Sequence, residues 1–454
     1  MPNDFWYALA PDLLMLGAVV VAMALEIARV GARWSQGAFI AAALGALAVL
    51  FDQFSGQYSA MPVAGELVVD RFAIVGKAVL LACALGVAAW FPGSARGHKF
   101  WILAASSLFG GMLVLEAASF ATLFLGIELL SLPAFALIVQ GQGRAAASEG
   151  AFKYLVLSSV ASALLLFGAS IGYGLTGTLG LEAFAGLFAT GTVQAQAALL
   201  LVLSGLFLKA AVFPFHAWAP DAYAAARLPV TALMASVVKA AVVLAIVRIV
   251  GPATLGTAAV SVITALAIVS IVFGNLAALG QARFKRLLAY SSVAHAGYMI
   301  FALLDTTGSR GTDLLWYTGL YGLATVLACA SYAVLCPGDD DSLARLDGAS
   351  ARRPFAAALL ELSMLSLAGV PPLPGFFAKL FVFKSVIASG HTAWATVAFV
   401  GSFLGLAYYV GIALRLWATR LEGTPPFPEE GKGNVASDGS VPSTSARRPD
   451  ETVA

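Results

Sequence analysis

Long apolar segments, each about the length needed to cross a lipid bilayer, follow one another along most of this 454-residue chain. The hydrocarbon core of a bilayer is about 30 Å thick, so one crossing takes roughly 20 apolar residues in a helix. Hydrophobic residues make up 60% of the chain and charged residues only 11%, which leaves too few charges to cover a water-soluble fold of this size. The sequence therefore predicts an all-α polytopic membrane protein.

Segments of that length predict about thirteen transmembrane helices, with ends uncertain by about four residues. Segment 355–388 is too long for one straight helix and contains Pro371, Pro372 and Pro374. Proline removes a backbone donor and clashes with the preceding turn, so we expect two half-helices joined at membrane depth. A milder interruption is expected at Pro214. The predicted spans are 6–27, 37–53, 72–91, 100–117, 119–140, 151–175, 193–217, 228–249, 253–279, 286–304, 312–336, 355–388 and 392–417.

Basic residues gather in alternate loops, whereas the opposite loops carry only Arg71, Arg248 and Arg310. Cytoplasmic loops are the ones enriched in Lys and Arg, which predicts an N-terminus outside and, after thirteen spans, a C-terminus inside. The first segment reads as a true span, and the polar stretch 418–454 as a disordered tail. The predicted cytoplasmic set is Arg29, Arg33, Arg96, Lys99, Arg144, Lys153, Arg227, Arg283, Lys285, Arg286, Arg345, Arg352 and Arg353.

Five ionisable side chains stand near the middle of predicted helices, where each costs at least about 2.5–3.5 kcal/mol to insert. Burial disfavours the charged form of an amine, and a neighbouring carboxylate restores it. An imidazole titrates near neutral pH and carries protons on either nitrogen. These groups therefore predict a proton relay linked by trapped water. They are one carboxylate, three amines and one imidazole on five different helices: Glu128, Lys209, Lys239, His295 and Lys379.

Each of these buried ionisable residues also has an interpretation as a purely structural residue. A single buried Lys–Glu pair is often structural, and a lone His in an apolar helix is more often a satisfied core residue. Five such groups together favour a functional site. Lys77, Glu116 and Lys384 lie close enough to helix ends to reach the interface with their charged tips, so we expect no special role for them. The sequence leaves the role of Glu361 open.

Other kinds of site find little support in the sequence. No His, Cys and Asp residues are spaced as metal ligands, and the three cysteines are too few for a four-thiolate cluster. A net charge of +2 without an extended basic cluster gives no reason to expect nucleic acid as a partner. His216 is expected at a helix end near the cytoplasmic surface, where it either takes up protons or caps carbonyl groups.

Segments 193–217 and 355–388 both combine a proline interruption with a buried lysine, and they are expected to run in opposite directions. Such a pair suggests an inverted-topology repeat. The match is imperfect, because Lys209 precedes its proline and Lys379 follows its prolines. Separately, the string FKYLVLSSVAS is similar to the string FKRLLAYSSVAH. We interpret this similarity as local chemistry at the basic start of two helices. The expected organisation is N-terminal helices in 1–99, repeats in 100–250 and 251–417, and the tail.

Four strings carry a resemblance to a known family. They resemble the antiporter-like proton-pumping membrane subunits of respiratory complex I, and most of all the family of subunit N of bacterial NADH:quinone oxidoreductase. The resemblance spans nearly the whole membrane region, and the PFHxWxPD and KRLLAYSS patterns are highly specific. The strings are LFLGIELLSLPAFAL (123–137), LKAAVFPFHAWAPDAY (208–223), FGNLAALGQARFKRLLAYSSVAHAGY (273–298) and LSLAGVPPLPGFFAKLFVF (365–383).

The resemblance implies a role for each buried group. Glu128 would modulate the pump amine Lys209, Lys239 would be the bridging lysine, and His295 would be the relay imidazole. Lys379 would stand at the second broken helix and connect to the exit or to a neighbouring subunit. The family also leads us to expect fourteen spans, one more than the sequence provides.

The resemblance further implies a proton-translocating subunit of complex I in the bacterial inner membrane. Its partners would be the other membrane subunits, neighbouring antiporter-like ones included, and the lipid bilayer. NADH, FMN, iron–sulfur clusters and quinone would be bound by other subunits, so no cofactor is expected in this chain. The alternatives are a subunit of a cation/proton antiporter or membrane-bound hydrogenase, and a purely structural spacer.

Overall fold

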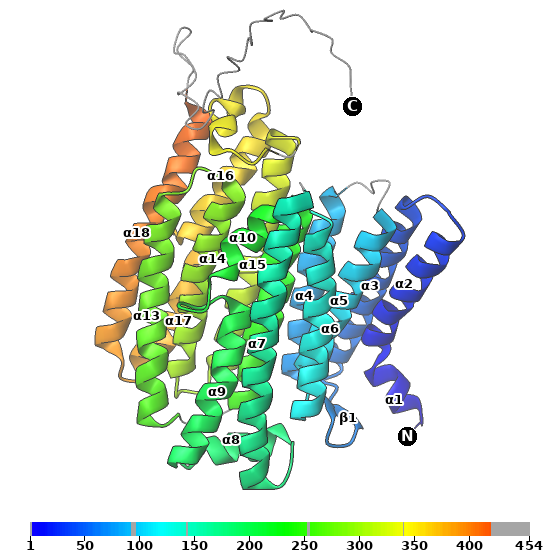
Figure 1. The fold of residues 1–454 in the computed structure, drawn as a ribbon, viewed down its shortest axis with the longest axis vertical. Helices are drawn as coiled ribbons and strands as arrows, with labels where there is room; N and C mark the ends of the chain where they lie inside the picture. Colours follow the sequence, from blue (N-terminus) through cyan, green and yellow to red (C-terminus); the bar gives the residue numbers. More distant parts are fainter. Residues whose placement is uncertain (1, 92–96, 142–143, 252–254, 339, 419–454) are drawn as a thin grey trace, which may run out of the picture. The chain divides into compact units, whose positions relative to one another are not determined.

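The computed structural model describes residues 2–91, 97–141, 144–251, 255–338 and 340–418 (Figure 1). Within this part of the chain, twelve helices are long and apolar enough to cross a membrane, so the protein is a multi-pass membrane protein. The predicted all-α fold is confirmed, apart from one small hairpin. The predicted position of Arg96 and the predicted disordered tail beyond Ala418 lie outside the described residues.

Most spans are single helices whose ends fall close to the predicted ones. Short helices lie beside them: α1 (Pro2–Ala8), which the sequence joined to the first span, and α8 (Leu181–Ala189), which it did not indicate. The single-helix spans are α2 (Ala10–Ile27), α3 (Arg33–Ser55), α4 (Arg71–Trp90), α5 (Gly97–Glu116), α6 (Phe120–Val139), α7 (Arg144–Thr176), α13 (Thr257–Leu279), α14 (Phe284–Phe301), α15 (Arg310–Leu335) and α18 (Thr392–Trp417).

The predicted interruption at Pro214 is a full break. Helix α9 (Val193–Ala210) ends at Ala211, whose left-handed φ of 59° turns the chain, and α10 (Trp218–Ala225) then continues the span. The span therefore extends beyond residue 217, where the sequence placed its end. Left-handed backbone is costly for a residue with a Cβ, so surrounding packing must hold this turn.

The second predicted break is confirmed as two half-helices. Helix α16 (Pro354–Ala368) ends at Gly369, whose φ of 87° suits glycine, and α17 (Pro374–Ala388) begins at a proline. Together they supply the thirteenth expected span. In Figure 1, α9 leads upward into α10, whereas α16 leads downward into α17, so the two broken spans run in opposite directions.

The span after α10 contains a local change of helix type. It runs as α11 (Leu228–Leu233), a π-helical stretch (Met234–Val238) and α12 (Lys239–Val250) without leaving the helical path. Single-turn π-bulges are often found at functional sites. This span and α14 are buried over nearly their whole length, so they form the centre of the described core.

Three pairs of neighbouring helices approach one another through glycine. An ideal Cβ at Gly274 would lie 2.5 Å from the backbone nitrogen of Ala294, joining α13 and α14. A Cβ at Gly205 would lie 2.5 Å from the carbonyl oxygen of Ala161, joining α9 and α7. Gly126 of α6 meets α5 in the same way. Small residues allow such backbone contact, which is the usual packing of helices in membranes.

A two-stranded hairpin that the sequence did not indicate precedes α4. Its strands β1 (Ala60–Val63) and β2 (Leu67–Val69) are antiparallel and turn at Gly65, where φ is 74°. Glu66 of this turn accepts hydrogen bonds from Ser119 and Thr122, which lower the pKa of its carboxyl group from the ordinary 4.5. The hairpin is thus fixed to the start of α6.

Candidate functional site

The first broken span brings a lysine to a carboxylate. Lys209, in the last turn of α9, is buried, and its Nζ lies 3.4 Å from Oε1 of Glu128 on α6. The amine also donates to Ser158 at 2.8 Å and to Ser131 at 3.2 Å. Ser162 donates to the same oxygen of Glu128. Two predicted relay groups therefore form one hydrogen-bonded unit, in which hydroxyl groups support both the amine and the carboxylate.

Lys239 has no carboxylate partner among the described residues. It begins α12 directly after the π-helical stretch, and its side chain is buried. Its Nζ donates to the carbonyl oxygen of Ser292 at 2.7 Å and to the hydroxyl of the same residue at 3.0 Å. Ser292 lies on α14, one turn before His295, so this amine contacts the helix that carries the predicted imidazole.

His295 is held between two tyrosines. Nδ1 lies 2.9 Å from the hydroxyl of Tyr317 on α15, and Nε2 lies 3.2 Å from that of Tyr409 on α18. Tyr409 in turn bonds Ser291 at 2.5 Å. Either ring nitrogen can donate or accept, and a hydroxyl group can do both, so protons can be passed through this set in either direction. The predicted relay imidazole is therefore hydrogen-bonded on both sides.

Lys379 lies at the second break. The side chain reaches back from α17 across the break, where Nζ donates to the carbonyl oxygen of Ala368 at 2.8 Å. It also donates to Ser402 of α18 at 2.8 Å and lies 4.9 Å from the centre of the Tyr298 ring. A cavity of about 400 Å³ lined by the break, Lys379 and Ser402 opens beside it. The amine is thus buried and borders a mostly apolar cavity.

His216 does not join these contacts in the described structure. It lies in the turn between α9 and α10, so it is placed within the broken span and not, as predicted, at the end of that span. Its ring stacks on Phe213 and packs against Phe273, with ring centres 5.4 and 4.7 Å apart. Nδ1 is buried and finds no hydrogen-bond partner among the described residues.

Four ionisable residues outside the predicted relay differ in their surroundings. Lys384 is exposed, in agreement with the interpretation as an interfacial residue. Glu361, which the sequence left open, bonds the indole nitrogen of Trp417 at 2.7 Å, away from the relay. For Lys77 and Glu116 the interfacial interpretation is wrong, because their side chains are 1% and 0% exposed and contact each other.

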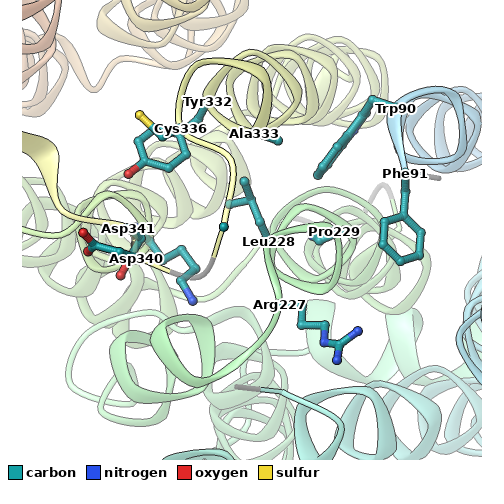
Figure 2. Close-up of a pocket in the computed structure, with 12 residues that line it drawn as sticks. Trp90, Phe91, Arg227, Leu228, Pro229, Tyr332, Ala333, Cys336, Asp340 and Asp341 are labelled. Atoms are coloured by element: carbon teal, nitrogen blue, oxygen red, sulfur yellow. Dashed lines mark hydrogen bonds between the residues drawn. The ribbon is translucent and has the colours of Figure 1, made fainter. Parts of the chain in front are cut away.

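A cavity with charged side chains opens at one end of the bundle, near the start of the helix that carries His295. This cavity of about 350 Å³ lies where the predicted cytoplasmic loops meet, and it is lined by Lys285 in the first turn of α14. Figure 2 shows Asp340 and Asp341 on one side of this cavity and Trp90 on another. Lys285 donates to the carbonyl oxygens of Ala224 and Ala226, where α10 ends. Charged side chains thus line an opening at the base of the helix that carries His295.

In the described part of the chain, no three His, Cys, Asp or Glu side chains come together as a metal site. What the structure gathers is a set of buried amines, a carboxylate, an imidazole and hydroxyl groups, with two of the amines at the breaks of the two broken spans. Ionisable residues inside a bundle mark ion pathways, and paired broken helices are typical of transporters. The fold and the site define a membrane protein of the ion-translocating class.

Comparison with known proteins agrees with this class. Residues 117–405 match the family described as NADH:quinone oxidoreductase/Mrp antiporter, transmembrane. A protein from Pelobacter propionicus named NADH-quinone oxidoreductase subunit N is 51% identical over 422 residues, which cover 93% of this chain and 91% of the relative. The chain therefore belongs to the NADH:quinone oxidoreductase/Mrp antiporter membrane family.

Two solved structures are also similar to this chain. A chain of respiratory complex I from Thermus thermophilus matches with a TM-score of 0.80 and 33% identity, covering 92% of each chain. A chain of the Mrp complex from a Dietzia species shares the fold, with a TM-score of 0.79 and 23% identity over 94% of this chain and 84% of the other. The predicted resemblance to subunit N is thus confirmed.

Proposed function

We propose that this chain translocates protons as a membrane subunit of NADH:quinone oxidoreductase in the bacterial inner membrane, with its N-terminus outside. The observation that carries the proposal is the hydrogen-bonded unit of Lys209 and Glu128, in which the buried amine lies beside a break in its helix and the carboxylate side chain is 25% exposed. Insertion of two ionisable groups at this depth costs several kcal/mol, on the order of 2.5–3.5 kcal/mol each, which an inert spacer has no reason to retain. The identity to subunit N supports the same conclusion.

The groups take the following roles in this proposal. Glu128 holds the ammonium form of Lys209, and separation of the pair releases the proton of the amine. Lys239 receives it and passes it through Ser292 to His295. Lys379 is the last group, at the second break. His216 is the weakest member, because its ring contacts are aromatic, and we assign it at most a part in proton uptake.

Water must complete the route where side chains do not touch. A cavity of about 10 Å³, lined by His295, Tyr317 and Ser366, is about the size of one water molecule and points from the imidazole toward the second break. Between Lys209 and Lys239 the described side chains make no direct hydrogen bond, although α9 packs against α12. We therefore place further water there.

We also propose the division of the chain into helices 1–99 and two inverted repeats, 100–250 and 251–417. Two features support it. The fourth span of each proposed repeat is the broken one, and the two broken spans run in opposite directions (Figure 1). The first two spans of each repeat are the glycine-packed pairs α5/α6 and α13/α14.

In this proposal the redox chemistry belongs to other subunits, which bind NADH, FMN, iron–sulfur clusters and quinone. Electron transfer there drives the separation of Lys209 from Glu128 through long-range coupling. The partners of this chain are the other membrane subunits, including antiporter-like ones.

Variants at the first broken span test the proposal in the assembled complex. Lys209→Ala and Glu128→Gln should each reduce proton pumping and the coupled reduction of quinone at least about tenfold, on the scale of a lost charged hydrogen bond. Lys384→Ala, an exposed lysine on α17, is the matched control and should pump normally. Assembly is checked by the yield of intact complex. Full pumping in both site variants would contradict the proposal, and copurification with antiporter or hydrogenase subunits would replace it with that alternative.

A further inference from the structure

A second cluster of buried charges lies in the N-terminal helices, outside the proposed relay. Nζ of Lys77 on α4 contacts Oδ2 of Asp12 on α2 at 2.5 Å and also Oε1 of Glu116 on α5. All three side chains are at least nine-tenths buried. Asp12 is in the first turn of its helix and Glu116 is the last residue of its own, so the cluster lies near the predicted outer ends of these helices.

The charges of this cluster do not balance. With all three groups ionised, two carboxylates face a single ammonium group, which leaves one net negative charge in a site closed to water. An unpaired buried charge is costly, and two carboxylates that share a site resist ionising together. One additional proton makes the cluster neutral.

The hydrogen bonds indicate where that proton is held. Oδ1 of Asp12 and Oε2 of Glu116 are both buried, and neither finds a partner among the described residues. Two bare carboxylate oxygens in a dry site are unfavourable, whereas a proton on either one turns it into a donor. Both carboxyl groups contact the same nitrogen of Lys77, so two acids compete for one ammonium group.

Charged groups on the neighbouring helices have partners of their own. Arg248 of α12 is paired in a two-bond contact with Asp70, Asp52 of α3 bonds Tyr7, and Asp313 of α15 bonds Ser309. Arg248 also donates to the carbonyl oxygen of Leu115 at 2.6 Å, the residue before Glu116. No second cation in the described contacts replaces the missing positive charge, although α12, the helix that begins with Lys239, reaches the residue before Glu116 through Arg248.

We infer that Asp12, Lys77 and Glu116 form a second proton-binding site, in which the two carboxyl groups hold one proton between them while Lys77 stays charged. The site lies on the outer side of the N-terminal helices and does not depend on the proposed relay. Arg248 of α12 contacts the backbone next to Glu116, so the site borders the helix that carries Lys239.

Infrared spectroscopy of the intact complex tests this inference. The protonated carboxyl group gives a carbonyl stretching band that moves when H2O is replaced by D2O. Asp12→Asn and Glu116→Gln should each abolish the band, because removal of either carboxyl leaves a neutral Lys–carboxylate pair that needs no proton. Lys77→Met should strengthen it, because both carboxyl groups then take a proton. Glu116→Asp keeps the site and should keep the band.

Controls separate this inference from the proposed function. Lys209→Ala should block pumping and leave the band unchanged, and Glu128→Gln should leave it unchanged as well. Loss of the band in only one of the two carboxyl variants would mean a single protonated acid and would overturn the shared proton. Absence of the band from the unmodified complex would show a purely structural ion cluster, and a band whose strength follows Na⁺ concentration at fixed pH would show a bound metal cation.

Discussion

Lys379 donates from its amine to the carbonyl oxygen of Ala368, across the break between two half-helices. Lys209 lies in the last turn of α9, at the corresponding end of the other broken helix. The carbonyl end of a helix carries partial negative charge and favours a cation. Although one lysine precedes its proline and the other follows, both are thus placed near the carbonyl end of the first half-helix, Lys209 by its position in the chain and Lys379 by the contact of its amine.

Gly369 should be essential to the position of Lys379. An added Cβ would lie 3.0 Å from Cδ and 3.1 Å from Nζ of the lysine, so Gly369→Ala would displace the amine. We expect a several-fold loss of proton pumping by the assembled complex, measured in proteoliposomes. Gly390→Ala is the control, since its φ of 89° resembles the 87° of Gly369 and nothing lies near its Cβ. Both should lose about 1–2 kcal/mol of stability to backbone strain, but only the first should lose pumping.

Ser158 should set the proton affinity of Lys209. Its hydroxyl accepts from the amine at 2.8 Å, and a hydrogen bond to a charged group is worth about 1.5–3 kcal/mol. Ser158→Ala should therefore lower the pumping rate by about tenfold. Ser159→Ala is the matched control, because that hydroxyl bonds only Leu155 of its own helix. Equal effects in both variants would assign the loss to helix packing.

The two tyrosines that hold His295 should contribute separately. Tyr317→Phe removes the partner of Nδ1 and Tyr409→Phe that of Nε2, so each leaves one buried ring nitrogen without a hydrogen bond. We expect each to slow pumping and both together to slow it no further than the slower single variant, as in a series path. Tyr408→Phe, which removes a bond to Asn275 next door, should pump as the unmodified complex does.

The hairpin should loosen in acid. Hydrogen bonds from Ser119 and Thr122 lower the pKa of Glu66 below its ordinary 4.5. A carboxyl group with a lowered folded-state pKa stabilises the fold above its unfolded value, and that stability is lost as pH falls through the folded value. We measure the midpoint temperature of thermal unfolding of the purified complex in detergent. Below about pH 4.5, this temperature should fall less steeply in Glu66→Gln than in the unmodified complex. A parallel drop in both proteins would show that the contact carries no linked stability.

The sequence alone was sufficient to predict the transmembrane spans and most residues of the proposed relay. Apolar segments of bilayer length need no tertiary information, and an ionisable residue in the middle of one must face protein. Glu128 and Lys209 were therefore identifiable without a structure. Their serine partners were partly visible too, because Ser158 and Ser292 both lie in the repeated SSVA strings, which we interpreted only as a basic helix start.

The same reasoning could not predict the contacts of ionisable residues near helix ends. Lys77 and Glu116 are close enough to an end to reach water, and only the packing of α2, α4 and α5 decides that they meet one another instead. Asp12 went unnoticed for the same reason. The hairpin has short strands and gains its order from Glu66 and Asp70, whose partners are distant in the chain.

The glycine contacts have a mechanical consequence. Helices whose backbones touch, as α13 and α14 do at Gly274, have no flexible side chains between them to absorb a displacement. Such a pair moves as one rigid unit, so a displacement that arrives from elsewhere must be taken up where other helices are interrupted. The turns at Ala211 and Gly369 are such interruptions, and they lie next to the two amines whose surroundings have to change in the proposed mechanism.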